Sequence, residues 1–263
     1  MRDILAEIVA YKRSEVRSKR FEVSIDQLQH SEFFARKCLS LKHSLLDANK
    51  TGIIAEFKRK SPSKGVINDQ VTVETITAAY TQHGASGISV LTDEKYFGGI
   101  NEDLEKSRQN NIPILRKDFI VDEYQLIEAK SIGADVILLI AACLSPIEVR
   151  TLASKAKVLG LEVLLEVHNE LELEHICDEV DLVGVNNRNL KIFEVNIQTS
   201  LDLINKIPKN KIAISESGIS DVETILTLKA AGFKGFLIGE NFMKQPDPTI
   251  AFADFVNDLK ARL

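Results

Sequence analysis

The chain has 263 residues, of which 44% are hydrophobic and 27% are charged, and its formal net charge is −5. This length suits one large domain or two small ones, and the apolar share is enough for a full core. The acidic balance argues against a nucleic-acid partner, because a phosphate backbone selects basic surfaces. An anionic small substrate stays open, because local positive charge can sit within an acidic protein.

The N-terminal segment and the cysteines favour a cytoplasmic protein. Charged residues throughout positions 1–20 leave no apolar core for a signal peptide, and no stretch approaches the roughly 18 apolar residues of a membrane span. Cys38, Cys143 and Cys177 are widely spaced without CxxC pairs, so we expect reduced, packed thiols. No histidine spacing indicates a metal site, and His168 and His175 are expected at the surface or beside a helix.

The first 48 residues are predicted to be helical. An apolar stripe that includes Ile4, Leu5 and Ile8 predicts one helix, and the spacing of Phe33 and Leu39 predicts a second over residues 31–46. Because so short a segment would be hard to stabilise alone, we expect it to pack on the remainder of the chain.

From position 51 onward, short apolar runs alternate with amphipathic stretches. The runs lie at 53–57, 87–91, 113–115, 136–140, 162–165, 182–185, 212–214 and 236–238, and helix-like stretches include 73–82, 123–131, 146–159 and 222–231. This alternation implies a parallel sheet with right-handed crossovers. Eight units favour a closed barrel over an open doubly wound sheet, whose GxGxxG motif is absent after the first run. The predicted fold is α/β, a single (β/α)8 TIM barrel over 49–263 with an N-terminal helical extension over 1–48.

In such a barrel, functional residues lie at the C-terminal ends of the strands. Glu56 and Lys58 close the first run, and residues two apart in a strand share one face. Two charges beneath a covering helix would be costly, so the barrel mouth is the favoured location, with a structural ion pair as the alternative. By the same alternation, Lys117 shares its face with Leu115.

Other runs end in polar or charged residues as well. Glu166 closes the fifth run, Asn186 follows the sixth and precedes Arg188, and Glu216 follows the seventh. Two lysines and three carboxylates at the ends of four strands predict a convergent acid–base site.

Glycine-containing loops after the last two strands predict a phosphate site. Ser217 and Gly218 follow the seventh strand, and Gly239, Glu240 and Asn241 follow the eighth. Barrels often bind phosphate with these two loops and a helix N-terminus. We expect backbone N–H groups to make the contact, with the Glu240 carboxylate pointing away. The segment 61–65 is predicted to be a flexible lid over the mouth, or else an ordinary solvated loop.

The motif EFKRKSPSKG at 56–65 resembles the EIKRASPSKG signature of indole-3-glycerol-phosphate synthases. Further matches follow in order, namely SVLTD at 89–93, FGG at 97–99, LRKDFI at 115–120, LEVH at 165–168, GVNNRNL at 184–190, SESGI at 215–219 and FLIG at 236–239. The resemblance spans essentially the whole chain and includes the helical extension. Lys60 and the segment 241–243 depart from the family pattern, which leaves the details of the phosphate contacts open.

This resemblance implies a cofactor-free ring closure in tryptophan biosynthesis. The substrate would be 1-(2-carboxyphenylamino)-1-deoxyribulose 5-phosphate, and the products indole-3-glycerol phosphate, CO2 and water. It implies Lys117 as general acid and Glu166 as general base, with Lys58 near the substrate carboxylate. Glu56, Asn186 and Glu216 would orient the substrate. The substrate-binding residues that it implies are Ser61, Phe97, Phe119, Arg188, Ser217, Gly218, Gly239, Glu240 and Asn241.

The sequence disfavours two other functions, and a monomer is expected. A phosphoribosylanthranilate isomerase would need a cysteine at the end of the first strand, where this chain has none. A catalytically inactive scaffold would have no reason to hold five ionisable groups at its strand ends.

Overall fold

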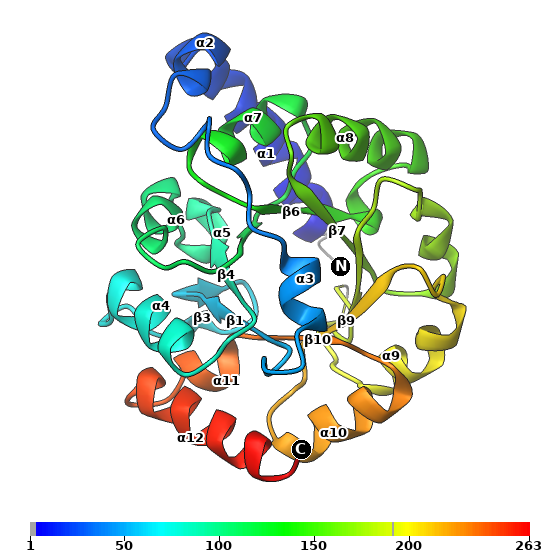
Figure 1. The fold of residues 1–263 in the computed structure, drawn as a ribbon. Coiled ribbons are helices and arrows are strands. Elements are labelled where there is room, and N and C mark those ends of the chain that lie inside the picture. The colour runs from blue at the N-terminus through cyan, green and yellow to red at the C-terminus, as the bar shows by residue number, and fades with distance from the viewer. Residues whose placement is uncertain (1–3, 191) are drawn as a thin grey trace.

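A computed structural model describes residues 4–190 and 192–263, so the first three residues of the expected extension lie outside the described part (Figure 1). Eight parallel strands close into one barrel, in which each strand pairs with the next and β1 pairs with β10. The predicted (β/α)8 barrel is therefore confirmed. The strands are β1 (Ile53–Phe57), β4 (Gly87–Leu91), β5 (Ile114–Lys117), β6 (Val136–Ile140), β7 (Glu162–Val167), β8 (Leu182–Asn186), β9 (Ile212–Glu216) and β10 (Gly235–Ile238).

Helices cover the outside of the barrel. The longer ones are α4 (Val73–Gln82), α6 (Asn101–Ser107), α7 (Glu123–Ser131), α8 (Pro146–Val158), α9 (Gln198–Leu203), α10 (Val222–Ala231) and α12 (Pro248–Ala261). Shorter ones are α5 (Glu94–Phe97), α11 (Glu240–Met243), η1 (Ala141–Cys143), η2 (Glu170–His175) and η3 (Ile204–Lys206). Side-chain caps fix several starts: Thr72, Asp122 and Asp221 each accept a backbone N–H of the first turn. None of the described helices combines the length and apolar composition of a membrane span.

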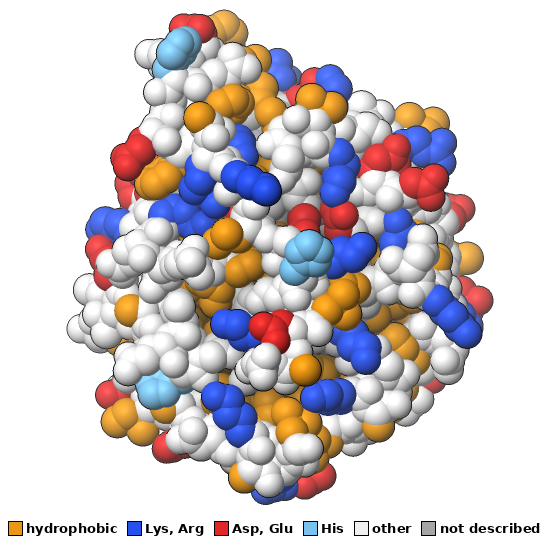
Figure 2. Space-filling model, viewed as in Figure 1, with side chains coloured by type: hydrophobic (Ala, Val, Ile, Leu, Met, Phe, Trp, Pro, Cys, Tyr) orange, Lys and Arg blue, Asp and Glu red, His pale blue; other side chains and the backbone are white. Residues whose placement is uncertain are grey.

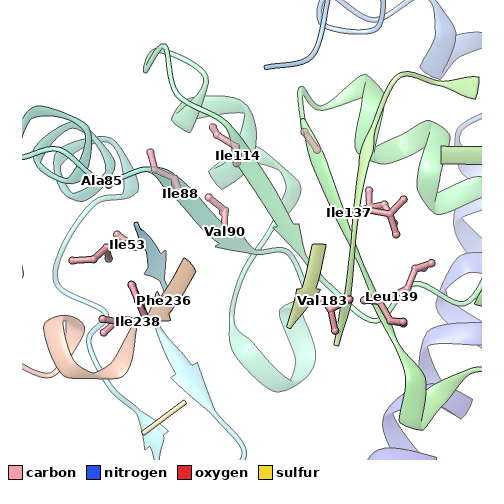
Figure 3. Close-up of a cluster of buried hydrophobic side chains, with 14 of the residues drawn as sticks. Ile53, Ala85, Ile88, Val90, Ile114, Ile137, Leu139, Val183, Phe236 and Ile238 are labelled. Atoms are coloured by element: carbon pink, nitrogen blue, oxygen red, sulfur yellow. The ribbon is translucent and has the colours of Figure 1, made fainter. Parts of the chain in front are cut away.

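Alternation along the strands separates two layers of apolar side chains. Outward-facing residues such as Ile88, Val90, Ile137 and Leu139 form the core beneath the helices (Figure 3). Inward-facing residues fill the barrel; among them are Ile54, Leu115, Leu164, Ile214 and Leu237. The next inward position after several of these is charged, so the period of two that fills the barrel also places a polar layer at its C-terminal end.

The N-terminal extension contains α1 (Ile4–Glu22), α2 (Ile25–Gln29) and α3 (Leu41–Leu46). The helix predicted over 31–46 is wrong for 31–40, which form turns and extended chain. The backbone N–H of Leu39 donates to Asp135 Oδ1 at 2.7 Å, and Arg36 Nη2 donates to the same oxygen at 2.6 Å. The buried Asp135 carboxylate, just before β6, accepts these hydrogen bonds. In a helix the backbone N–H of Leu39 would instead donate to a carbonyl of the preceding turn.

Helix α3 closes the N-terminal end of the barrel, which faces the viewer in Figure 1. Leu41 is 1% exposed and joins Leu45 in the inner core, and a Cβ at Gly87 would lie 2.6 Å from Leu41 Cδ1. The same face carries interspersed positive and negative side chains with scattered apolar ones (Figure 2). The opposite end, where the strands finish, is the open one.

Candidate active site

A cavity of about 1030 Å³, its open mouth included, lies at the C-terminal ends of the strands. An adjoining cavity shares part of its lining, including Glu56, Lys58 and Arg188. The structure brings all of the predicted site residues to these two cavities. The first is lined by Glu56, Lys58, Ser61, Phe97, Lys117, Phe119, Glu166, Asn186, Arg188, Ser217, Glu216 and Glu240, and the second adds Gly218, Gly239 and Asn241.

Glu56 and Lys58 face the cavity from the end of β1. Lys58 Nζ donates to Glu56 Oε1 at 2.7 Å, and Ser89 Oγ donates to Glu56 Oε2 at 3.3 Å. A Cβ at Gly239 would lie 2.6 Å from Glu56 Oε1, so this glycine leaves room for the carboxylate. The two charges therefore pair at the barrel mouth, where they are open to a ligand.

Lys117 lies at the centre of the charged layer. Its Nζ donates to Glu166 Oε2 at 2.9 Å and lies 3.5 Å from Glu216 Oε2, which joins β5 to β7 and β9. Burial lowers the pKa of Lys117, but the charge and hydrogen bond of Glu166, together with Glu216 and Glu56, outweigh it and hold this pKa above its ordinary value. Lys117 is therefore an ammonium at neutral pH, and it carries a proton that it can donate.

The two carboxyl groups beside Lys117 differ in their protonation. Burial raises the pKa of both, and for Glu216 the nearby charge of Glu166 adds to this, so its pKa is raised. For Glu166 the positive charges of Lys117 and His168 outweigh the effect of burial, so its pKa falls well below the ordinary value. A carboxylate and a carboxylic acid thus lie side by side, an arrangement that separates the roles of base and hydrogen-bond donor.

The polar end of the site is lined by cations around one carboxylate. Arg188 Nη2 lies 3.6 Å from Glu240 Oε2, and Lys64 Nζ lies 3.9 Å from Glu240 Oε1. Lys58 and Lys244 line the same cavity. The Glu240 carboxylate thus has cations on both sides in the lining of the cavity, so the expectation that it points away is wrong. The remaining positive charge suits an anion.

The loops after β9 and β10 meet at this end. Ser217 has φ 65° and Gly218 has φ 77°, and such a conformation is uncommon for a residue other than glycine, so the turn is constrained. Asn241 Nδ2 donates to Ser220 O at 3.2 Å, which ties the start of α11 to the loop before α10. Two helix starts therefore flank the cavity.

The other end of the site is apolar. The rings of Phe97 and Phe119 lie with centroids 6.1 Å apart at 37°. Ile4, Leu5 and Ile8 of α1 line the same cavity, a contribution that the sequence interpretation missed. Their apolar spacing predicts the helix and its packing but does not indicate that the helix lines a cavity.

The segment predicted as a flexible loop after β1 contains a small hairpin, with β2 (Lys60–Ser61) antiparallel to β3 (Gly65–Val66). Its base is fixed by Arg59, whose Nη2 donates to Asp103 Oδ1 at 2.8 Å. Ser61, Pro62 and Ser63 line the cavity, so the tip of the hairpin forms part of the mouth.

His168 was not predicted as a site residue. It directly precedes η2, beside a helix as expected, but its side chain is only 11% exposed and lies against Glu166. His175 is the last residue of η2 and is buried too, with Nε2 2.9 Å from Leu144 O, so both histidines lie beside a helix, as expected, and neither is at the surface. Across residues 4–190 and 192–263, no group of three or more histidine, cysteine, aspartate or glutamate side chains is arranged to hold a metal ion.

Comparisons with known proteins agree with this geometry. The family model described as indole-3-glycerol phosphate synthase matches residues 5–255. The chain is 47% identical to the indole-3-glycerol phosphate synthase of Bacteroides thetaiotaomicron over 261 residues, covering 99% of this chain and 100% of that protein. It is 42% identical to the enzyme of that name from Polynucleobacter asymbioticus, covering 97% and 99%, and 41% identical to that from Bordetella pertussis, covering 97% and 100%. The chain therefore belongs to the indole-3-glycerol phosphate synthase family.

Proposed function

We propose that this chain converts 1-(2-carboxyphenylamino)-1-deoxyribulose 5-phosphate to indole-3-glycerol phosphate, CO2 and water by general acid–base catalysis without a cofactor. The observation that carries the proposal is the Lys117 ammonium, held 2.9 Å from Glu166 Oε2 and 3.5 Å from Glu216 Oε2. Such a group can protonate a carbonyl while a carboxylate waits beside it as a base. The names of the relatives support the same reaction.

The two ends of the cavity suit the two ends of this substrate. The carboxyphenyl ring fits the apolar end, where Phe97, Phe119 and the α1 side chains offer flat and aliphatic surface. The phosphate fits the basic end, against Gly218 and the helix start at Glu240 and Asn241, with Gly239, Arg188 and Ser217 beside it and Ser61 in the adjoining part of the cavity. This orientation places the ribulose carbonyl over the charged layer.

Ring closure then uses Lys117 as the acid. The ring carbon that bears the carboxylate attacks the carbonyl carbon, and the carbonyl oxygen takes a proton from Lys117 Nζ. The bond to the carboxylate breaks, CO2 leaves, and the bonding electrons restore the aromatic ring. Lys58 lies near the carboxylate and favours its binding in the ionised form. Glu56, Asn186 and Glu216 orient the nitrogen and the hydroxyl groups.

Dehydration completes the indole. Glu166 removes a proton from the carbon next to the nitrogen, and the hydroxyl leaves as water with a proton supplied by Lys58. The 2.9 Å contact between Glu166 and Lys117 lets the proton return to the amine, which resets both groups. Lys58 regains its proton from solvent.

Replacing Lys117 by methionine tests the acid role. We expect Lys117→Met to lower kcat by ~100- to 10,000-fold, the usual contribution of a general acid, while substrate binding changes comparatively little. Indole absorbance measures turnover, and titration of the inactive variant with substrate measures binding. Lys209→Met, at an exposed lysine in the turn before β9, is the matched control. No indole from the unaltered protein would overturn the proposed function, and a collapse of binding with turnover retained would overturn the acid role.

We also propose that the protein is a cytoplasmic monomer that binds no nucleic acid, with residues 1–48 and 49–263 acting as one domain. The net charge of −5 and the absence of CxxC pairs support this. Helix α1 of the extension lines the same cavity as the barrel strands, which supports one domain. Light scattering after gel filtration should give a mass near 29.3 kDa, and a multiple of that mass would contradict the monomer.

A further inference from the structure

The general base Glu166 has a second cation beside it, on the side away from Lys117. Its Oε2 receives Lys117 Nζ at 2.9 Å, and its Oε1 lies 3.3 Å from Nε2 of His168. His168 follows β7 by one residue, so its inward position continues the alternation that places Glu166 in the cavity. The Glu166 carboxylate is thus held between two cationic groups, one for each oxygen.

His168 is itself fixed from behind by Glu172 of η2. Its Nδ1 lies 3.1 Å from Glu172 Oε2, and its backbone N–H donates to the same oxygen at 2.8 Å. The other oxygen of Glu172 accepts Asn169 Nδ2 at 2.7 Å, and Asn169 Oδ1 caps η2 by accepting the backbone N–H of Glu172. One short turn of chain therefore sets the direction of the imidazole ring.

The charges around the ring keep it protonated. Burial lowers the pKa of His168, but Glu166 and Glu172 outweigh it and raise this pKa to about 10. Glu166 faces the ring from its own strand and Glu172 from η2, and the charge of Lys117 on β5 lies beyond Glu166. At neutral pH the charges thus alternate along four neighbouring side chains: the Glu172 carboxylate, the His168 imidazolium, the Glu166 carboxylate and the Lys117 ammonium.

We propose that His168 is a positioning residue for the general base: its imidazolium, held by Glu172, fixes Glu166 Oε1 so that Oε2 faces Lys117 and the substrate. This inference rests on the proposed function. His168 keeps its proton throughout the cycle and transfers none. Its second effect is electrostatic, since a fixed positive charge keeps Glu166 ionised beside protonated Glu216 and so keeps the base and the acid distinct.

Kinetics of three variants test the proposal. We expect His168→Gln, which keeps a polar side chain but loses the charge, to lower kcat at least about tenfold with KM within about twofold. The acid limb of its kcat/KM profile should move to higher pH, because Glu166 then gains a proton more easily. Glu172→Gln should shift the profile in the same direction by less, and the double variant should lose no more than His168→Gln alone. Glu170→Gln, in the same turn but 65% exposed and paired with Lys206, is the matched control and should behave as the parent.

A spectroscopic measurement separates this inference from the reaction itself. In protein labelled with 15N-histidine, the His168 signals should remain those of an imidazolium from pH 6 to 9 and become titratable near neutrality in Glu172→Gln. A neutral His168 at pH 7.5 in the parent would overturn the proposal, as would an unmoved pH profile in His168→Gln or a loss confined to thermal stability. If the parent forms no indole but the ring stays charged, the proposed function fails and the electrostatic arrangement stands.

Discussion

Two glycines in the inner wall of the barrel leave room for two carboxyl groups of the candidate site. Gly184 on β8 and Gly239 after β10 occupy inward positions, two residues after Leu182 and Leu237 of the inner core. A Cβ at Gly184 would overlap Oε1 of Glu216, just as one at Gly239 would crowd Glu56. The missing side chains let both carboxylates lie in the wall of the barrel. Burial there is what raises the pKa of Glu216.

Adding one methyl group at Gly184 should therefore lower catalytic activity more than it lowers the stability of the fold. In Gly184→Ala, the Cβ would displace the Glu216 carboxylate away from Lys117, and we expect kcat to fall by at least about tenfold. Gly160→Ala is the contrasting control, because its Cβ would meet nothing within 4 Å although its φ is +75°. That variant should lose thermal stability and keep its kcat. Equal kcat values for the parent and Gly184→Ala would show that Glu216 has no such requirement.

The residues of the candidate site can be predicted from the sequence more fully than the side chains that surround them. The inward direction of Lys117, Glu166 and Glu216 follows from a period of two, which one short strand is enough to fix. The direction of the His168 ring depends on Glu172, four residues later in a turn whose shape no periodicity predicts. The space left by Gly184 depends on a neighbouring strand, and it appears only when the barrel closes.

Among the elements, α1 is attached to the site by one buried charge. Lys12 is 1% exposed, and its Nζ lies 2.9 Å from Asp93 Oδ2 and 3.0 Å from Asp118 Oδ1. Asp93 caps α5, which carries Phe97, while Asp118 directly follows Lys117. The helix that lines the apolar end of the cavity is therefore held by residues next to Lys117 and at the start of the helix that carries Phe97.

Removing this charge should loosen the helix and the cavity together. We expect Lys12→Met to cost about 3–5 kcal/mol of unfolding free energy, because the buried carboxylates of Asp93 and Asp118 both lose this ammonium. KM should rise as well, since Ile4, Leu5 and Ile8 would no longer be held against the mouth. Urea unfolding and steady-state kinetics measure the two effects. Lys19→Met, on the same helix with its side chain 31% exposed, should cost at most about 1 kcal/mol. Similar losses in both variants would argue against the anchoring role.

The elements themselves were largely predictable, and their ends were less so. The third apolar run was placed at 113–115, whereas β5 continues through Arg116 and Lys117, which pair with Val90 and Leu91. The sequence alone disfavours an outward-facing Arg116 in the strand, because burying its charge beneath a helix without a partner would cost free energy. In the structure, ion pairs with Asp118 at 3.1 Å and with Glu128 on α7 offset the free energy of burying the Arg116 guanidinium.

At the scale of the whole molecule, the two ends of the barrel differ in their side chains. The N-terminal end is closed by apolar packing of α3, and the C-terminal end gathers charge around a cavity. The eight-fold alternation predicted this polarity, because strands of one direction put all their C-terminal ends on one side. The path of 31–40 between the two ends was not predictable, since it follows Asp135 and not an apolar period.

Charge gathered at one end makes the stability of the molecule depend on pH. The pKa of His168 rises from 6.5 to about 10 on folding, so the stability it contributes is fully present below pH 6.5 and is lost as the pH rises towards 10. The unfolding free energy of the parent should therefore exceed that of His168→Gln most at about pH 6, and the difference should shrink steadily by pH 10. Urea titrations at several pH values measure this difference. A gap that widens as the pH rises would contradict the charged state of the ring.

The position of the extension has a consequence for synthesis on the ribosome. Helix α1 emerges before any strand exists, yet Asp93 and Asp118, which hold Lys12, come some 80 to 105 residues later. The inner core that receives α3 is completed only when β10 contributes Leu237. Helix α1 lacks these partners until Asp118 has been made, and α3 lacks part of its docking surface until β10 has been made. The mouth of the cavity also needs Gly239 and Glu240, which follow β10, so a chain arrested before β10 carries Lys117 and Glu166 without a complete cavity.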